Sequence, residues 1–295
     1  MKRTKQFQKW IEGARPKTLI ASISPVLIGS VIAFSDGFFS LPIFAAAFLF
    51  ALLVQVGTNF ANDYLDFLKG VDTKNRKGPR RLVQGGLVTP EKMRRVTFAV
   101  FGIAALLGLY LMTIGGWPIG FLAAFAILLG YLYTGGPFPL GYLGLGDLFV
   151  LVFFGPVATG GVYYLLAGKL SSIAILAGLA PGCLSTAILT MNNLRDYESD
   201  KKANKKSLPV RFGLSFGKWE FATLLACGIA VPLALFAQGK SHPFSLASSL
   251  SFALAFPLIR NVFSFSSPEK LGPLFSKVGK LLTLYTLLFV IGWLL

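Results

Sequence analysis

The chain has 295 residues, of which 54% are hydrophobic and only 14% are charged. A soluble domain would carry about a quarter charged residues, so the composition excludes an ordinary soluble protein and indicates an integral membrane protein. The formal net charge of +16 would suggest nucleic-acid binding in a soluble protein. We predict no nucleic-acid partner, because Lys and Arg of a membrane protein gather in the loops on one side of the bilayer.

The apolar segments, taken in chain order, predict nine transmembrane helices. Each has roughly the 17 to 25 mostly apolar residues that a helix needs to cross a lipid bilayer. They lie at about 18–34, 41–60, 96–114, 117–134, 147–167, 173–193, 220–237, 243–260 and 279–295. The sequence therefore predicts an all-α bundle that forms one domain over residues 1–295.

The basic residues predict the orientation of this bundle. With the amino terminus placed in the cytoplasm, 26 of the 28 Lys and Arg residues lie in or beside the inside segments, and only Lys169 and Lys240 lie outside. This asymmetry follows the positive-inside rule. We therefore predict a multi-pass protein of the cytoplasmic membrane with a cytoplasmic amino terminus.

Shorter patterns add three expectations. Thr89-Pro90-Glu91 and Ser267-Pro268-Glu269 each combine an N-cap hydroxyl, a proline and a first-turn acid, which predicts a helix start. Arg15-Pro16-Lys17 is expected to anchor the first span at the membrane surface. His242 is the only histidine in the chain, which excludes a metal site built on several histidines.

The first of two acidic clusters lies at the end of the second predicted span. Asn59, Asp63 and Asp66 are spaced i, i+4, i+7, and Asn62 precedes Asp66 by four residues. On a helix these positions share one face. The segment therefore predicts a ladder of oxygen ligands beside the cytoplasmic end of the helix.

The second cluster follows the sixth predicted span. Asn192, Asp196 and Asp200 are spaced i, i+4, i+8, which again predicts a single helical stripe. Asn193 is expected either to join this shell or to bond a neighbouring helix. Asp147 is expected either to begin a helix or to contact substrate.

Together the two clusters predict a magnesium–diphosphate site. Carboxylates are costly at membrane depth and indicate function, and Mg²⁺ binds through one or two carboxylates and substrate phosphates. Simple helix capping or pairing with interfacial lysines is the alternative. The bases that could balance the phosphate charge are Arg76, Lys77, Arg80, Arg81, Arg195, Lys201, Lys202, Lys205, Lys206 and Arg211.

Several stretches now point to a known family. Asn62-Asp63-Tyr64-Leu65-Asp66 with the later Asp196-x-x-x-Asp200 resembles the intramembrane aromatic prenyltransferases of the UbiA superfamily. Val83-Gln84-Gly85-Gly86-Leu87, Tyr131-Leu-Tyr-Thr-Gly-Gly-Pro137 and Asn192-Asn-Leu-Arg-Asp196 are similar to the branch that prenylates 1,4-dihydroxy-2-naphthoate in menaquinone synthesis. Gly70 replaces the third Asp of the common pattern, with Asp72 nearby, and the loop 133–137 lacks the Lys of other branches.

The resemblance implies a nine-helix, Mg²⁺-dependent enzyme. A polyprenyl diphosphate would ionise, and the prenyl group would replace the carboxylate of the naphthoate, giving demethylmenaquinone. The implied metal ligands are Asp63, Asp66, Asp196 and Asp200, with Asn59, Asn62 and Asn192 completing the shell. The implied diphosphate contacts are Arg76, Arg80, Arg81, Arg195 and Lys201, and the implied acceptor contacts are Gln84 and Tyr133.

Two other functions remain open at this point. The same enzyme chemistry could use another acceptor, such as 4-hydroxybenzoate, homogentisate or haem. A secondary transporter could use the acidic ladders as an ion site, since transporters also place buried acids near broken helices.

Overall fold

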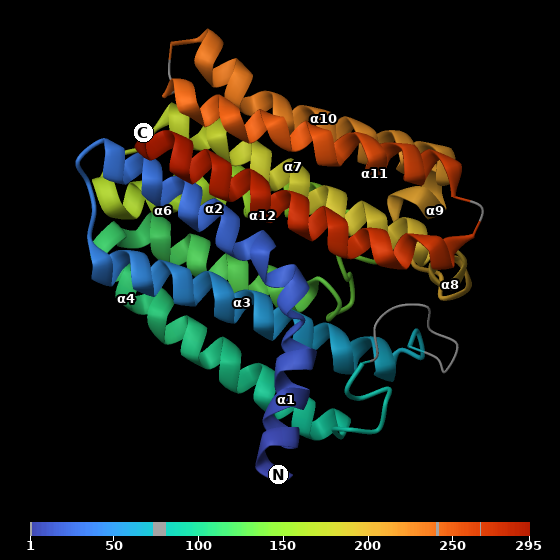
Figure 1. The fold of residues 1–295 in the computed structure, drawn as a ribbon. Coiled ribbons are helices and arrows are strands. Elements are labelled where there is room, and N and C mark those ends of the chain that lie inside the picture. The colour runs from blue at the N-terminus through green and yellow to red at the C-terminus, as the bar shows by residue number, and fades with distance from the viewer. Residues whose placement is uncertain (1, 73–80, 240–241, 266) are drawn as a thin grey trace.

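The computed structural model describes residues 2–72, 81–239, 242–265 and 267–295, and every regular element among them is a helix (Figure 1). The predicted all-α fold is therefore confirmed. The elements are α1 (Lys2–Ala14), α2 (Pro16–Ser35), α3 (Leu41–Leu68), α4 (Pro90–Leu132), α5 (Gly146–Val152), the π-helical turn η1 (Phe153–Val157), α6 (Ala158–Ala167), α7 (Ser172–Arg195), α8 (Tyr197–Lys202), α9 (Leu208–Phe212), α10 (Leu214–Ala237), the 3₁₀ segment η2 (Pro243–Ser251), α11 (Phe252–Ser264), η3 (Pro268–Leu271) and α12 (Gly272–Leu294).

Eight helices of the described residues are long and apolar enough to cross a membrane, if Gly146–Ala167 and Pro243–Ser264 are each taken as one span. The segment α4 contains two of the predicted spans. Its 43 residues would extend about 64 Å as a straight helix, roughly twice the thickness of the hydrocarbon core. The number of membrane crossings depends on how α4 is divided, so the count of nine stays a prediction.

The two arms of α4 meet at Gly116, whose backbone angles are φ 70 and ψ −169. A positive φ of this kind favours glycine, because glycine has no Cβ atom to clash. The second arm returns beside the first (Figure 1), and a Cβ on Gly108 would lie 3.0 Å from that of Ala123. The gap predicted between residues 114 and 117 therefore corresponds to a reversal of the chain.

The helix α7 forms the centre of the bundle, with α2, α10 and α12 packed around it. Its small residues allow close approach to α5 and the distorted turn η1: a Cβ on Gly182 would collide with the Leu151 carbonyl oxygen. Small residues serve this purpose in membrane bundles, where close backbone contact replaces the hydrophobic effect as the packing force.

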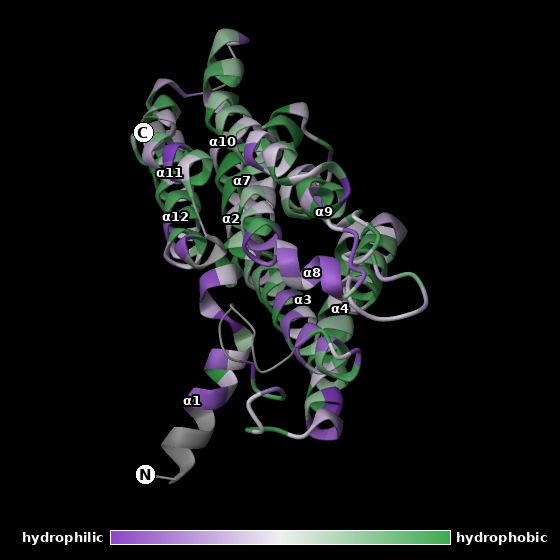
Figure 2. Cartoon of the chain, turned by 90° about the vertical axis from the view of Figure 1, so that its right-hand side faces the viewer, coloured by the Kyte–Doolittle hydropathy of each residue, from purple (hydrophilic) through white to green (hydrophobic). Residues whose placement is uncertain are grey.

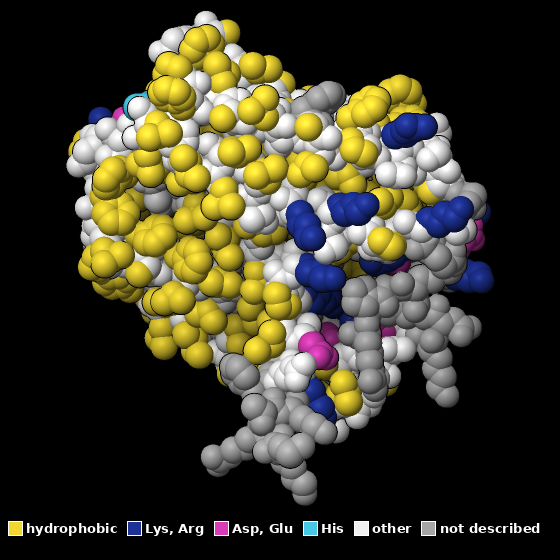
Figure 3. Space-filling model, in the orientation of Figure 1, with side chains coloured by type: hydrophobic (Ala, Val, Ile, Leu, Met, Phe, Trp, Pro, Cys, Tyr) yellow, Lys and Arg dark blue, Asp and Glu magenta, His cyan; other side chains and the backbone are white. Residues whose placement is uncertain are grey.

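The outer surface divides into an apolar belt and a basic end. Trp117 and Phe121 of α4 are each 71% exposed, and apolar side chains cover much of the face shown in Figure 3. Lys and Arg gather toward one end of that face, and hydrophilic residues surround α8 and the lower end of α3 in Figure 2. Such a surface suits a multi-pass membrane protein with one strongly basic end.

Two helix-start predictions have different outcomes. The Thr89 hydroxyl accepts a hydrogen bond from the Lys92 amide at 3.3 Å, with Pro90 at the first helical position, so this start is confirmed. At the second, Pro268 begins only the 3₁₀ segment η3, and the α-helix α12 begins at Gly272. That prediction is wrong by four residues because a 3₁₀ turn precedes the α-helix.

Candidate active site

The two acidic clusters come together at the basic end of the bundle. The Lys205 ammonium lies 3.1 Å from Asp200 and 6.0 Å from the centre of the Tyr142 ring, whose hydroxyl bonds Asp66, so one cation lies near carboxylates of both clusters. Burial alone would lower the pKa of Lys205, but the carboxylates of Asp200, Asp66 and Asp196 outweigh it and raise that pKa. The two clusters therefore lie at the same end of the bundle, and a shared metal site built from them stays a prediction.

Asp66 is the most heavily bonded acid of the first cluster. Its Oδ2 accepts hydrogen bonds from Arg81 at 2.9 Å and from Asn62 at 3.0 Å, and its Oδ1 accepts one from the Tyr142 hydroxyl at 2.7 Å. Burial, and then the charge of Asp66, raise the pKa of Tyr142. Tyr142 therefore remains a hydrogen-bond donor to this carboxylate throughout the physiological pH range.

Arg81 is buried between two acids. Its guanidinium forms ion pairs with Asp66 at 2.9 Å and with Asp72 at 3.0 Å, and it donates a hydrogen bond to the Asn62 carbonyl at 2.7 Å. Burial alone would lower the pKa of Arg81, but the charges of Asp66 and Asp72 outweigh this effect and raise that pKa. Asp72, which is offset from the common motif, thus serves to hold Arg81 beside Asp66.

Asp63 anchors the segment that carries Arg81. Its Oδ2 accepts a hydrogen bond from the Leu82 amide at 2.9 Å and its Oδ1 one from the Val83 amide at 3.0 Å, and its exposure is 1%. Both carboxylate oxygens therefore fix backbone. The metal role inferred for Asp63 from the motif stays a prediction, and the geometry gives it this additional role.

Replacing Asp63 by Asn should destabilise this segment. An amide offers one acceptor and one donor, so one of the two backbone amides would face an NH₂ group. Because a hydrogen bond to a charged group contributes about 1.5–3 kcal/mol, we expect a loss of about 2 kcal/mol in unfolding free energy and faster proteolysis near residues 81–88 without added metal. Unchanged proteolysis and thermal stability would contradict the anchoring role.

The two asparagines of the first cluster hold the start of α2 in place. Asn59 donates to the Ala14 carbonyl at 2.8 Å, and Asn62 accepts a hydrogen bond from Arg15 at 3.1 Å. Arg15 has a left-handed backbone (φ 55). Arg15 was expected only to anchor the first span at the membrane surface. Its side chain also bonds Asn62 beside the acid cluster.

The second cluster is interrupted by a helix break. α7 ends at Arg195 and α8 begins at Tyr197, so the helix through Asn192, Asp196 and Asp200 is not continuous, although the Asp196 amide still donates to the Asn192 carbonyl at 2.9 Å. The Asp200 amide still donates to the Asp196 carbonyl at 2.8 Å, which keeps the two acids on one side. Arg195 donates to both oxygens of its neighbour Asp196, at 2.8 and 2.6 Å.

Lys205 reaches Asp200 because α8 ends in a Schellman motif. Asn204 has φ 57, and the Lys205 amide donates to the Asp200 carbonyl at 2.9 Å, as this motif requires. The Lys205 ammonium then lies 3.1 Å from Asp200 Oδ2. Burial raises the pKa of the Asp200 carboxyl to about 6, although Lys205 opposes the shift.

The other predicted residues are distributed more widely. Lys201 is exposed, Asn192 is half-buried, and Gln84 lies half-buried in the turn after Arg81. Arg76 and Arg80 lie outside the described residues. Asn193 donates weakly to Asp147 at 3.4 Å, so it joins α7 to α5, and Asp147 lies in the first turn of α5 as expected.

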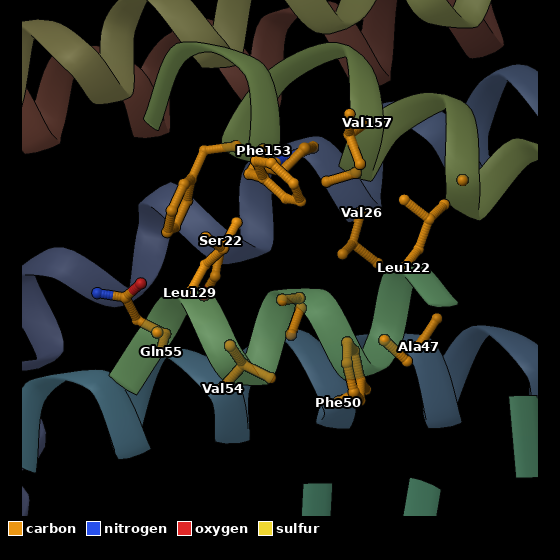
Figure 4. Close-up of a pocket in the computed structure, with 18 of the residues that line it drawn as sticks. Ser22, Val26, Ala47, Phe50, Val54, Gln55, Leu122, Leu129, Phe153 and Val157 are labelled. Atoms are coloured by element: carbon orange, nitrogen blue, oxygen red, sulfur yellow. The ribbon is translucent and has the colours of Figure 1, made fainter. Parts of the chain in front are cut away.

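Tyr133 connects the acid cluster with an apolar cavity. Its chain neighbour Thr134 accepts a hydrogen bond at 2.8 Å from Asn62, which in turn bonds Asp66. Burial, and then the charges of Asp147, Asp200 and Asp66, raise the pKa of Tyr133. The ring of Tyr133 lines a cavity of about 200 Å³ between α2, α3, α4 and the α5–α6 segment (Figure 4). The remaining lining is mostly aliphatic and aromatic, including Val26, Phe50 and Phe153.

The cluster suits a hard divalent cation by its donor chemistry. Asp66, Asp196 and Asp200 each already contact a cationic side chain, so the acids balance positive charge here. In the described parts of the chain, no three acid, cysteine or histidine side chains are grouped closely enough to ligate one ion together. Mg²⁺ nevertheless fits, since it commonly takes one or two carboxylates and completes its shell with water and substrate phosphate.

Two residues near the site, Tyr142 and Lys69, were missed by the site prediction from sequence. Tyr142 and Lys69 meet at the loop after α4, where the Lys69 ammonium lies 4.5 Å from the centre of the Tyr142 ring and donates to the Thr134 carbonyl. No sequence pattern marks either residue. Lys205 was named only among the nearby bases, although Asn204 could have signalled the turn that brings it to Asp200.

The chain is similar to known proteins over nearly its whole length. The profile of the UbiA prenyltransferase family matches residues 22–294. Curated relatives include the 1,4-dihydroxy-2-naphthoate octaprenyltransferases of Escherichia coli, 38% identical over 97% of this chain and 94% of the relative, and of Haemophilus influenzae, 35% identical over 98% and 97%.

Solved structures share the fold at lower identity. An apo structure of a UbiA homolog from Aeropyrum pernix K1 has a TM-score of 0.71 at 13% identity and covers 94% of this chain and 98% of its own. A UbiA homolog from Archaeoglobus fulgidus bound to DMAPP and Mg²⁺ has a TM-score of 0.61 at 16% identity and covers 96% and 99%. The family profile, the curated relatives and the fold agree: this chain belongs to the UbiA prenyltransferase family.

Proposed function

We propose that this protein transfers a polyprenyl group from an allylic diphosphate to 1,4-dihydroxy-2-naphthoate in menaquinone biosynthesis. The observation that carries the proposal is the position of the acid cluster at the apolar cavity: Asn62, which bonds Asp66, also donates to Thr134, the chain neighbour of the cavity-lining Tyr133. The curated relatives named for this reaction support it, as does the Archaeoglobus homolog that holds DMAPP and Mg²⁺.

In the proposed reaction, the carbon–oxygen bond of the prenyl diphosphate breaks and the prenyl carbon bonds to the ring carbon that carries the carboxylate. Diphosphate and carbon dioxide leave, and the quinol form of demethylmenaquinone remains. One or two of the carboxylates of Asp66, Asp196 and Asp200, together with water and substrate phosphate, would hold Mg²⁺, which would act as a Lewis acid that neutralises the leaving diphosphate. The apolar cavity would hold the isoprenoid and keep water from the allylic cation.

The basic residues would assist departure of the diphosphate. Lys205 and Arg195 lie against the proposed metal ligands and would contribute fixed positive charge near the leaving group. Charge placed in advance in a water-excluded site is worth more than the same charge in water. Arg81 already bridges Asp66 and Asp72, so we propose that it holds the acids in place.

We propose that the active site faces the cytoplasm from the cytoplasmic membrane. The elements that surround the acid cluster, α1, α8 and the end of α3, lie at the end of the bundle that carries most of the basic residues (Figures 1 and 3). By the positive-inside rule this end is cytoplasmic. Soluble naphthoate would then enter from the cytoplasm, and the isoprenoid from the bilayer.

Membranes that contain the protein should convert farnesyl diphosphate and 1,4-dihydroxy-2-naphthoate into a lipophilic quinone in the presence of Mg²⁺, and EDTA should stop the conversion. A panel with 4-hydroxybenzoate, homogentisate and haem tests the other acceptors. Flux of substrate into sealed vesicles without any product would instead support a transporter.

Lower pH should increase the requirement for Mg²⁺. A metal ligand must be deprotonated, and Asp200, with a pKa of about 6, becomes protonated as the pH falls below that value. We expect the Mg²⁺ concentration for half-maximal turnover to be nearly constant above pH 7 and to rise roughly tenfold per pH unit below 6. Rates at saturating Mg²⁺ control for unfolding, and a pH-independent requirement would exclude Asp200 as a ligand.

A further inference from the structure

The mostly apolar cavity contains one amide side chain, the half-buried Gln55, at one end of the lining (Figure 4). Its Oε1 atom is buried and has no hydrogen-bond partner. An acceptor left unsatisfied in this way costs about 1–3 kcal/mol relative to a bonded one. Because such atoms are uncommon in folded proteins, this oxygen calls for a donor that the protein itself does not supply.

The orientation of this amide is fixed by its neighbours. The Asn59 Nδ2 atom donates to the Ala14 carbonyl at 2.8 Å and to the Thr18 hydroxyl at 3.2 Å. A carbonyl only accepts, so Asn59 must direct its NH₂ group there and its Oδ1 toward Gln55. Gln55 therefore presents its own NH₂ to Asn59, through a long contact of 3.5 Å, and keeps Oε1 as an acceptor.

Two neighbouring hydroxyls of the lining have their donors engaged. Ser22 donates to the Leu19 carbonyl at 2.9 Å, and Thr58 donates to the Val54 carbonyl at 2.8 Å. Each hydroxyl thus bonds a backbone carbonyl of its own helix. Neither donates to Gln55, which leaves its Oε1 open to a donor from a molecule in the cavity.

The position of Gln55 suits a substrate that spans the site and the cavity. Gln55 precedes Asn59 by one helical turn on α3, and it lies about 16 Å from Asp66 along the axis at about 1.5 Å per residue. It therefore lies beyond the direct reach of the metal ligands. The group that bonds Gln55 is therefore not the diphosphate itself.

The chemistry of the substrates shows which of them can donate a hydrogen bond to Gln55 Oε1. An isoprenoid chain is a hydrocarbon without hydrogen-bond donors, and the oxygens of an ionised diphosphate only accept. The dihydroxynaphthoate carries phenolic O–H groups, which donate. We propose that Gln55 binds a ring hydroxyl of the aromatic acceptor and thereby selects hydroxylated acceptors; this inference rests on the proposed function of the site.

Equilibrium binding to the purified protein tests the proposal without turnover. The probes are 1,4-dihydroxy-2-naphthoate and its 1,4-dimethoxy analogue, which lacks the donors. We expect the unaltered protein to prefer the dihydroxy compound roughly tenfold, the value of one hydrogen bond of about 1.4 kcal/mol. Gln55→Leu should reduce the ratio of the two affinities to near one and leave the affinity for a farnesyl thiolodiphosphate within about twofold.

The matched control is Gln238→Leu, the same exchange at the exposed end of α10, which should retain the preference. The added bulk of the methoxy groups affects both proteins, so only loss of the preference in Gln55→Leu supports the hydrogen bond. An unchanged ratio in that variant, or no preference or no binding in the unaltered protein, would overturn the proposal. Failure of the unaltered protein to form a prenylated naphthoate rejects the proposed function separately.

Discussion

Replacing Asp200 by Asn should lower the rate of diphosphate release roughly 10²- to 10³-fold, the effect of removing one preorganised electrostatic contact to a developing charge. Asp200 contacts Lys205 and faces Asp66 and Asp196, so the loss of its charge removes a proposed metal ligand while the fold retains its other contacts. Asp196→Asn should have a similar effect. Release of diphosphate from farnesyl diphosphate by the purified protein measures both.

The matched control is Asp36→Asn, which removes an acid at the opposite end of α2 from the site. Asp36 accepts a hydrogen bond from Tyr163 at 2.6 Å and is exposed. This variant should retain turnover within about twofold, since surface substitutions have small effects. Full activity of Asp200→Asn at unchanged Mg²⁺ would contradict the metal assignment.

The Arg81→Met variant should lose both stability and activity. Methionine retains much of the volume but leaves the carboxylates of Asp66 and Asp72 without the cation that they now share. Removing one partner of a buried ion pair costs about 3–5 kcal/mol. We expect a lower midpoint of thermal unfolding in detergent and a loss of Mg²⁺-dependent turnover.

A second substitution separates charge from packing in this prediction. In the double variant Arg81→Met with Asp72→Asn, one of the two uncompensated charges is gone, so part of the lost stability should return. If Arg81→Met unfolds at the same temperature as the unaltered protein, then the guanidinium does not hold the acids together.

Hydropathy was sufficient to locate the spans because the lipid interior requires apolar side chains at every position that it contacts. The segment predicted at 173–193 is observed at Ser172–Arg195. The segment predicted at 41–60 continues as helix to Leu68, although its last two turns are polar. Contacts to Arg81, Leu82 and Tyr142 support those turns, and hydropathy does not register such contacts.

Helical spacing identified the acids of the candidate site but not their partners. The spacing of Asn59, Asp63 and Asp66 correctly placed their α-carbons along one helix, yet Asp63 faces backbone amides while Asp66 faces Arg81. These partners lie in connecting segments, where no periodicity relates sequence position to direction. For this reason Tyr142 and Lys69 escaped prediction, and Lys201 was preferred to Lys205.

The stoichiometry of carbon dioxide and diphosphate release is the most direct test of the central claim. The purified protein would receive farnesyl diphosphate, Mg²⁺ and 1,4-dihydroxy-2-naphthoate with a labelled carboxyl group. We predict one labelled carbon dioxide for each diphosphate and each prenylated product, and none after EDTA. Two outcomes would contradict decarboxylative prenyl transfer at this site. One is release of diphosphate without carbon dioxide, and the other is no release of either product when both substrates and Mg²⁺ are present.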